Sequence, residues 1–109
     1  MNFESAQTTY LDHLRIERGL SQNTTSSYTR DLLKFADFLR EGSKDFTLLV
    51  GSDLTDFEVW LKGQKLALSS INRTLSAVKG LYKYLQLEYE MSNPTLDLVS
   101  AKLARKLPK

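Results

Sequence analysis

Large apolar side chains recur at helical spacing in four segments of the chain, and the longest segment covers residues 68–90. Steps of four and three residues separate its apolar positions, which are Ile71, Leu75, Val78, Tyr82, Leu85 and Tyr89. Such steps put side chains on one face of a helix with about 3.6 residues per turn. From Ser69 to Leu87 the segment contains no acidic residue. The pattern predicts a long helix with an apolar inner face and a cationic outer face.

Three shorter segments show the same periodicity, and we predict helices over residues 3–18, 22–41 and 52–62. Their expected inward residues are Phe3, Tyr10, Leu11 and Leu14, then Tyr28, Leu32, Phe35 and Leu39, and finally Leu54, Phe57, Trp60 and Leu61. Ser21 is a suitable N-cap for the second helix, and Gly19 and Gly63 are suitable stop signals. We therefore expect an all-α fold, a four-helix bundle that occupies residues 1–100.

Two further segments connect to this bundle. Residues 42–50 carry an apolar patch of Phe46, Leu48, Leu49 and Val50, which we expect to lie against the bundle as a loop, since no other segment offers a partner strand. Asn93 and Pro94 are suited to cap and begin a short fifth helix near residues 94–100. Residues 101–109 contain Lys102, Arg105, Lys106 and Lys109 and no acid, as in a basic arm or linker.

Composition narrows the class of protein. A chain of 109 residues with 41% hydrophobic content can bury a core as one domain. The chain has no cysteine, which excludes disulfides and thiolate metal sites, and no window approaches the ~20 apolar residues of a membrane span. We expect a cytoplasmic protein that uses no membrane and no cofactor.

Charge is distributed unevenly along the chain. Residues 1–66 carry a net charge of −2, whereas residues 67–109 carry +4. The cationic excess therefore falls on the predicted long helix and the tail, which favours a polyanionic partner.

Small polar residues crowd the start of the second helix, where Ser21, Asn23, Thr24, Thr25, Ser26 and Ser27 follow one another closely. Free backbone N–H groups and the positive end of the helix dipole would make this turn a phosphate seat. Ordinary helix capping explains the cluster about equally well. Gly80 also has two possible explanations. A glycine within a helix indicates close approach either of DNA or of another helix.

Titratable residues give little sign of catalysis or of a metal site. His13 is the single histidine and is expected at the surface, because no second histidine or cysteine exists to share a site. Asp53, Asp56 and Glu58 are interpreted as favouring the dipole at a helix start rather than as metal ligands.

Two stretches resemble a known family. LSQNTTSSYTRDLLKFADFL is similar to one conserved stretch of the tyrosine recombinases, which include phage-type integrases and Xer-like resolvases, and SSINRTLSAVKGLYKYL followed by NP and RKLPK is similar to a second. The resemblance implies the N-terminal core-binding, SAM-like domain, which grips half of a recombination site. A separate C-terminal domain would cut and rejoin DNA, and the full protein would assemble as a tetramer on paired sites, whereas the isolated domain would be monomeric.

The resemblance also implies that the first parts of the second and fourth helices enter the major groove of duplex DNA. Carried over to this chain, it points to Asn23, Thr24, Ser26, Ser27 and Arg30, and to Ser69, Ser70, Asn72, Arg73 and Ala77. The cationic face itself adds Lys34, Ser76, Lys79 and Lys83, and the tail adds Lys102, Arg105 and Lys106. Arg73 is our first candidate for base readout, because its guanidinium matches guanine, and Asn72 is a candidate partner for adenine. Contacts to phosphates are expected from Arg30, Lys34, Lys79 and Lys83.

The family's chemistry needs arginines and histidines around a nucleophilic tyrosine, and no such constellation is evident in this chain. We therefore expect a binding domain and no enzyme within these residues. One alternative is a helical interaction module that binds an acidic protein partner. A helix-turn-helix regulator is less suitable, because the long fourth helix does not match the compact recognition helix of that motif.

Overall fold

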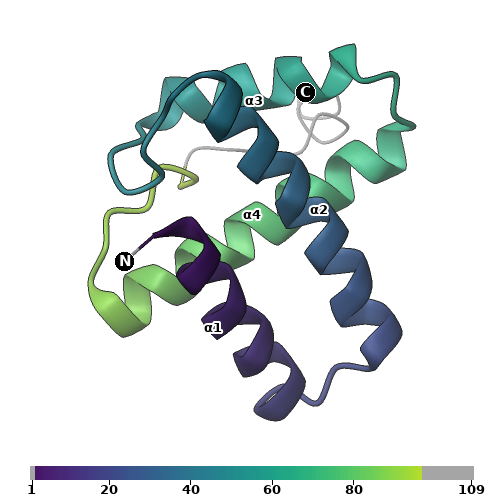
Figure 1. Cartoon of the computed structure of the whole chain (residues 1–109), viewed down its shortest axis with the longest axis vertical. Helices are drawn as coiled ribbons and strands as arrows, with labels where there is room; N and C mark the ends of the chain where they lie inside the picture. The colour runs from purple at the N-terminus through teal and green to yellow at the C-terminus, as the bar shows by residue number, and fades with distance from the viewer. Residues whose placement is uncertain (1, 97–109) are drawn as a thin grey trace, which may run out of the picture.

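The computed structural model describes residues 2–96, and within this range the chain is helical with no strand (Figure 1). Its elements are α1 (Phe3–Ile16), α2 (Gln22–Glu41), α3 (Gly51–Gly63) and α4 (Leu68–Tyr89). The predicted all-α, four-helix architecture is confirmed. The predicted bounds of α2 agree with the structure, and those of the other helices differ by one or two residues.

Local sequence explains where the helices begin and end. Asn2 Oδ1 accepts a hydrogen bond from the Ser5 N–H at 2.8 Å, and Ser21 Oγ accepts one from the Thr24 N–H at 3.2 Å, so both side chains cap helix starts. Gly19 has a φ of +65°, a left-handed conformation that suits glycine and ends the first helical segment. Helix α4 begins after Ala67, which offers no capping side chain.

Helix α4 runs through the middle of the molecule and packs against the other three helices, with α2 crossing it (Figure 1). The fully buried centre of the core contains Phe35 of α2, Phe57 of α3 and Tyr82 of α4. The Tyr82 hydroxyl donates a hydrogen bond of 2.7 Å to the Phe46 carbonyl, which ties the α2–α3 loop to α4. Burial raises the pKa of Tyr82 above its ordinary range.

The predicted inward faces are largely correct, with three exceptions. Tyr89 is 45% exposed, because the last turn of α4 extends past the helices that cover the rest of it. In the α2–α3 loop, Phe46 and Leu49 are buried as predicted, whereas Leu48 and Val50 are exposed. The loop buries only part of its apolar patch.

The structure describes only the first residues of the predicted fifth helix, up to residue 96. Residues 94–96 form a turn, and the Asn93 side chain accepts a hydrogen bond of 2.9 Å from the Thr95 N–H. The remainder of the predicted fifth helix and the predicted basic linker lie outside the described residues. None of the described helices combines the length and apolar content that crossing a bilayer would need.

Candidate nucleic-acid interface

A buried carboxylate joins α2 to α4 where the two helices cross. Asp31 of α2 is fully buried. Arg73 of α4 donates to it twice, from Nε to Oδ2 at 2.8 Å and from Nη2 to Oδ1 at 3.1 Å. Thr74 Oγ1 adds a hydrogen bond of 3.2 Å to Oδ1, and Lys34 Nζ lies 3.5 Å from the same oxygen. The hydrogen bonds from Arg73 to Asp31, together with the charge of Asp31, raise the pKa of Arg73.

This arrangement changes the role expected for Arg73. Guanine readout by arginine uses a pair of guanidinium N–H groups, and two such donors of Arg73 point at Asp31. Although the Arg73 side chain is 45% exposed, its first function in the fold is to hold α4 against α2. Base readout by Arg73 stays a prediction, and it would have to use the donors that Asp31 leaves free.

The sequence contained a signal for Asp31 that the interpretation of the sequence missed. Asp31 stands three residues after Tyr28 and four before Phe35, so it lies on the apolar face of its own helix. Aspartate is almost never fully buried without a partner. An acid at such a position therefore indicates a cation on a neighbouring helix.

Most of the predicted DNA-contacting side chains are accessible on α2 and α4. The exposed ones are Asn23, Thr24, Ser26, Arg30, Ser69, Arg73, Ser76, Lys79 and Lys83, and the half-buried ones are Ser27, Lys34, Ser70 and Asn72. Arg30 Nη2 donates to Ser27 Oγ at 3.3 Å. Within residues 2–96, Arg30, Lys79 and Lys83 form no ion pair. The first turns of α2 and α4 lie on the same side of the molecule (Figure 1).

The accessible residues are not all gathered at the crossing. Ser26 lines a hollow between α1 and α2 together with Leu11 and Arg15. Lys83 lines another hollow, between α1 and α4, together with Arg18. These two residues lie at the margins of the predicted face. Lys102, Arg105 and Lys106 lie outside the described residues.

Two predicted features of α4 have structural explanations. Ala77 is 1% exposed, so its side chain packs in the core, and its assignment as a DNA contact is corrected. Gly80 lies directly beneath the Tyr10 hydroxyl of α1, and an added Cβ there would overlap that hydroxyl. Close packing of α1 on α4 therefore accounts for the glycine.

The polar cluster at the start of α2 is divided between capping and free groups. Ser21 caps the helix, and Thr25 Oγ1 donates back to the Ser21 and Gln22 carbonyls at 3.2 and 3.0 Å. These hydrogen bonds are made with backbone groups of the first turn of α2, so the side chains that form them are engaged within the helix. Asn23 and Ser26 form no side-chain hydrogen bond within the described part of the chain, and their exposed polar groups are available to a ligand.

Two acidic side chains of α3 have partners within or next to the helix, Asp53 at its first turn and Glu58 in its second half. Asp53 Oδ2 accepts a hydrogen bond of 2.9 Å from the Val50 N–H, and Asp53 Oδ1 lies 3.0 Å from Lys44 Nζ. The bond from the Val50 N–H, reinforced by Lys44, lowers the pKa of Asp53. Glu58 pairs with Lys62 at 3.4 Å. Among residues 2–96, no group of three histidine, aspartate or glutamate side chains is placed to hold a metal ion.

Tyr84 lies among polar and charged side chains of α1 and α4. Its ring centroid lies 4.7 Å from that of His13, and both residues line the hollow that includes Arg18 and Lys83. A nucleophilic tyrosine would benefit from a lowered pKa. Partial burial instead raises the pKa of Tyr84, so its environment favours packing over nucleophilic attack.

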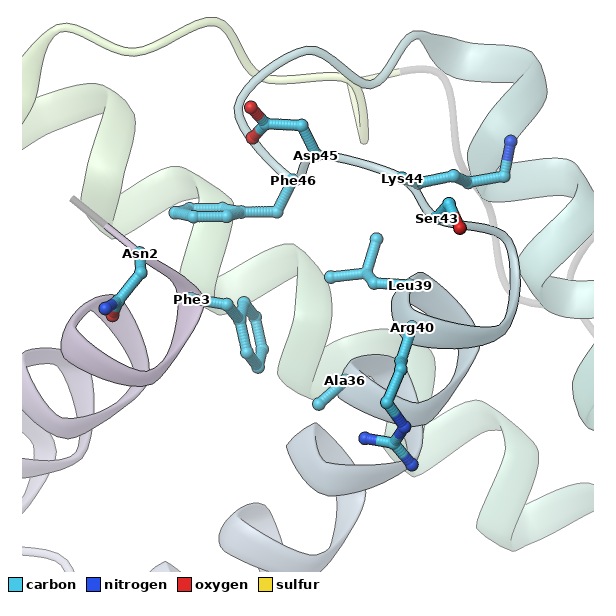
Figure 2. A pocket seen from close by; sticks show the side chains of 9 residues that line it. All are labelled: Asn2, Phe3, Ala36, Leu39, Arg40, Ser43, Lys44, Asp45 and Phe46. Atoms are coloured by element: carbon cyan, nitrogen blue, oxygen red, sulfur yellow. The ribbon is translucent and has the colours of Figure 1, made fainter.

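A larger hollow, of about 580 Å³, lies between the start of α1 and the end of α2 (Figure 2). Its floor is apolar, with Phe3, Leu39 and Phe46 among the lining residues. The rim cations Arg40 and Lys44 are paired with Asp37 and Asp53 respectively. This hollow therefore suits a polyanion less well than the α2/α4 face does.

Comparison with known proteins gives the family. The model of the phage integrase N-terminal SAM-like domain matches residues 8–89. The chain is 37% identical over 102 residues to tyrosine recombinase XerC of Herpetosiphon aurantiacus, covering 92% of this chain and 33% of the relative. It is 35% identical over 101 residues to tyrosine recombinase XerD of Vibrio cholerae, with coverage of 92% and 33%, and 39% identical over 101 residues to XerD of Rhizobium meliloti, with coverage of 92% and 32%.

The chain thus spans about a third of the length of these curated relatives. No solved structure matched it. The matched region contains all of α2, α3 and α4 and most of α1. This chain belongs to the family of phage integrase N-terminal, SAM-like domains and is a domain of the tyrosine recombinase type.

Proposed function

We propose that this chain binds duplex DNA by placing the N-terminal halves of α2 and α4 in the major groove. It would grip one half of a recombination site for a tyrosine recombinase in the cytoplasm. Cutting and rejoining of DNA would belong to the two thirds of the relatives that this chain does not cover. Assembly of the full-length protein as a tetramer on paired sites is part of the same proposal.

One observation carries the proposal, namely that the N-terminal halves of two crossing helices share an accessible cationic face without an exposed acid. Helix α4 has no acidic residue from Ser69 to Leu87, and α2 has none before Asp31. The charge of Asp31 is buried and is matched by Arg73 and Lys34. Phosphates approaching the N-terminal halves of α2 and α4 would therefore meet cations without a competing carboxylate, whereas Glu88 shares the hollow that Lys83 lines.

The accessible residues suggest a division of roles. Arg30, Lys79 and Lys83 would contact phosphates, because each is exposed and free of ion pairs within the described residues. Ser69, Asn72 and Ser76 share the outer arc of α4 and have short side chains that suit close contact with base edges. Asn72 Oδ1 is buried without a hydrogen-bond partner in the described part, and a side-chain rotation would present it to a base donor.

The test is a salt titration of duplex binding with one matched pair of variants. Binding of the wild-type chain to random duplex DNA should weaken with salt, with a log–log slope of several units, because phosphate contacts release counterions. Arg30→Ala should weaken binding and reduce that slope by about one unit. Arg40→Ala is the control, because Arg40 is near the other end of α2 and is paired with Asp37. Arg40→Ala should leave both the affinity for duplex DNA and its salt slope nearly unchanged.

Two results would contradict the proposal. A chain that binds no duplex at low salt would favour the alternative, a helical module for an acidic protein partner. Equal losses from Arg30→Ala and Arg40→Ala would show that total charge matters and the α2/α4 face does not.

A further inference from the structure

We infer that Asp31 is a positioning residue for sequence selection, because it fixes the relative placement of the two helices that face DNA. The inference rests on the proposed function and assigns Asp31 a role without any contact to DNA. Asp31 is fully buried, so no base or phosphate can reach its carboxylate in this arrangement.

The geometry of the contact explains why it can set a position. The carboxylate of Asp31 receives two hydrogen bonds from one planar guanidinium, and a third from Thr74 Oγ1, all of them from α4. A two-pronged contact between planar groups is directional, whereas the hydrophobic effect is non-directional. The contact joins residues 42 and 43 positions apart in the chain, so it restricts how α2 lies on α4.

The contact between Asp31 and Arg73 lies next to side chains that would face DNA. Arg30, the unpaired cation of α2, is the immediate neighbour of Asp31, and Asn72 is the immediate neighbour of Arg73. A rotation of one helix against the other would move these side chains by different amounts. Sequence selection needs side chains from both helices in register with base edges, whereas contacts to phosphates depend mainly on charge.

The test compares selection by the wild-type chain and by variants. A duplex is first selected from a random library with the wild-type chain, and dissociation constants are then measured for that duplex and for a scrambled one at the same salt. Asp31→Asn keeps the shape of the side chain and removes its charge. It should weaken binding to the selected duplex about tenfold, the loss of one well-aligned interaction, and leave binding to the scrambled duplex unchanged or tighter.

Asp37→Asn is the matched control, because Asp37 lies on the same helix and pairs with Arg40 three residues away. It should leave the ratio of the two affinities unchanged. A purely structural role for Asp31 would lower both affinities by the same factor, since only the folded fraction would change. That result would overturn the inference, as would an equal fall in the ratio for the two variants.

A double variant covers the case in which Asp31→Asn does not fold. Asp31→Leu with Arg73→Met replaces the buried pair by apolar groups, which often maintains stability. Circular dichroism should show that it is folded. A folded double variant that keeps the wild-type ratio of selected to scrambled affinities would overturn the inference, because selection would then need neither Asp31 nor its contact with Arg73. If the wild-type chain selects no duplex at all, the proposed function itself fails, and the inference fails with it.

Discussion

Gly80→Ala should destabilise the domain because α1 and α4 are in close contact at this position. A Cβ at residue 80 would overlap the Tyr10 hydroxyl, and the Tyr10 side chain is 6% exposed and cannot swing freely into solvent. Overpacking of this kind costs about 1–3 kcal/mol, and the helix propensity of alanine returns about 1 kcal/mol. The expected net loss in the free energy of unfolding is therefore up to about 2 kcal/mol.

Removing the hydroxyl should reverse the effect. In a Tyr10→Phe background the nearest atom to the new Cβ would be Cζ of residue 10, at 3.4 Å, which is close to an ordinary contact. Gly80→Ala should then stabilise the domain by about 0.5–1 kcal/mol. Burial raises the pKa of Tyr10 to about 12, so the hydroxyl is neutral at neutral pH and the overlap is steric.

The assay is urea unfolding followed by circular dichroism for the wild-type chain, the two single variants and the double variant. The cycle should give a coupling energy of about 1–3 kcal/mol between the two positions. Gly63→Ala is the control, since a Cβ built there meets no side chain and no other segment of the fold within 4 Å. Equal effects of Gly80→Ala in the two backgrounds would refute the steric explanation. A folded double variant that loses duplex binding would instead indicate that DNA approaches Gly80.

Three other changes probe the core, the start of α3 and the cationic face. Leu75 is 1% exposed, so Leu75→Ala should lower the free energy of unfolding by about 2–5 kcal/mol, and a urea midpoint equal to that of the wild type would contradict the described packing. Asp53→Asn should cost about 0.5–2 kcal/mol at neutral pH. The pKa of Asp53 is lowered in the fold, so the stability that its carboxylate contributes is complete above the unfolded-state pKa. This stability is lost as the pH falls through the folded-state pKa. A difference in the free energy of unfolding between wild type and Asp53→Asn that persists in acid would exclude this account. Lys79→Ala combined with Lys83→Ala should reduce the salt slope of duplex binding by about two units and weaken all sequences alike, whereas a loss confined to one sequence would assign these lysines to base readout.

The fold was predictable because local signals agree with the tertiary packing. The apolar periodicity of α2 and α4 and the cap at Ser21 each specify a helix from residues close together in the chain. The exceptions lie where burial depends on distant neighbours. Tyr89 continues the apolar periodicity of α4, but its exposure is decided by where the covering helices end.

The candidate site was less predictable, because its central contact is non-local. Arg73 has the same sequence signature whether it faces DNA or a buried acid, and only the packing of α4 on α2 brings it to Asp31. Ala77 is likewise buried only in the folded core, and Gly80 lies beneath Tyr10 where α1 packs on α4. A sequence pattern identifies which residues share a helix face, but it does not identify which residue lies opposite them.

The distribution of ion pairs distinguishes the α2/α4 face from the rest of the described surface. Near the end of α2 and on α3, Arg40 and Lys62 are matched by Asp37 and Glu58 on neighbouring turns. Phosphates would be repelled by those carboxylates as much as attracted by the cations. At the α2/α4 crossing the matching acid is Asp31, which is fully buried and engaged by hydrogen bonds from α4. Burying this carboxylate joins the two helices and at the same time removes a repulsive charge from their outer surface, so one side chain supports both the packing and the electrostatics that binding to DNA would require.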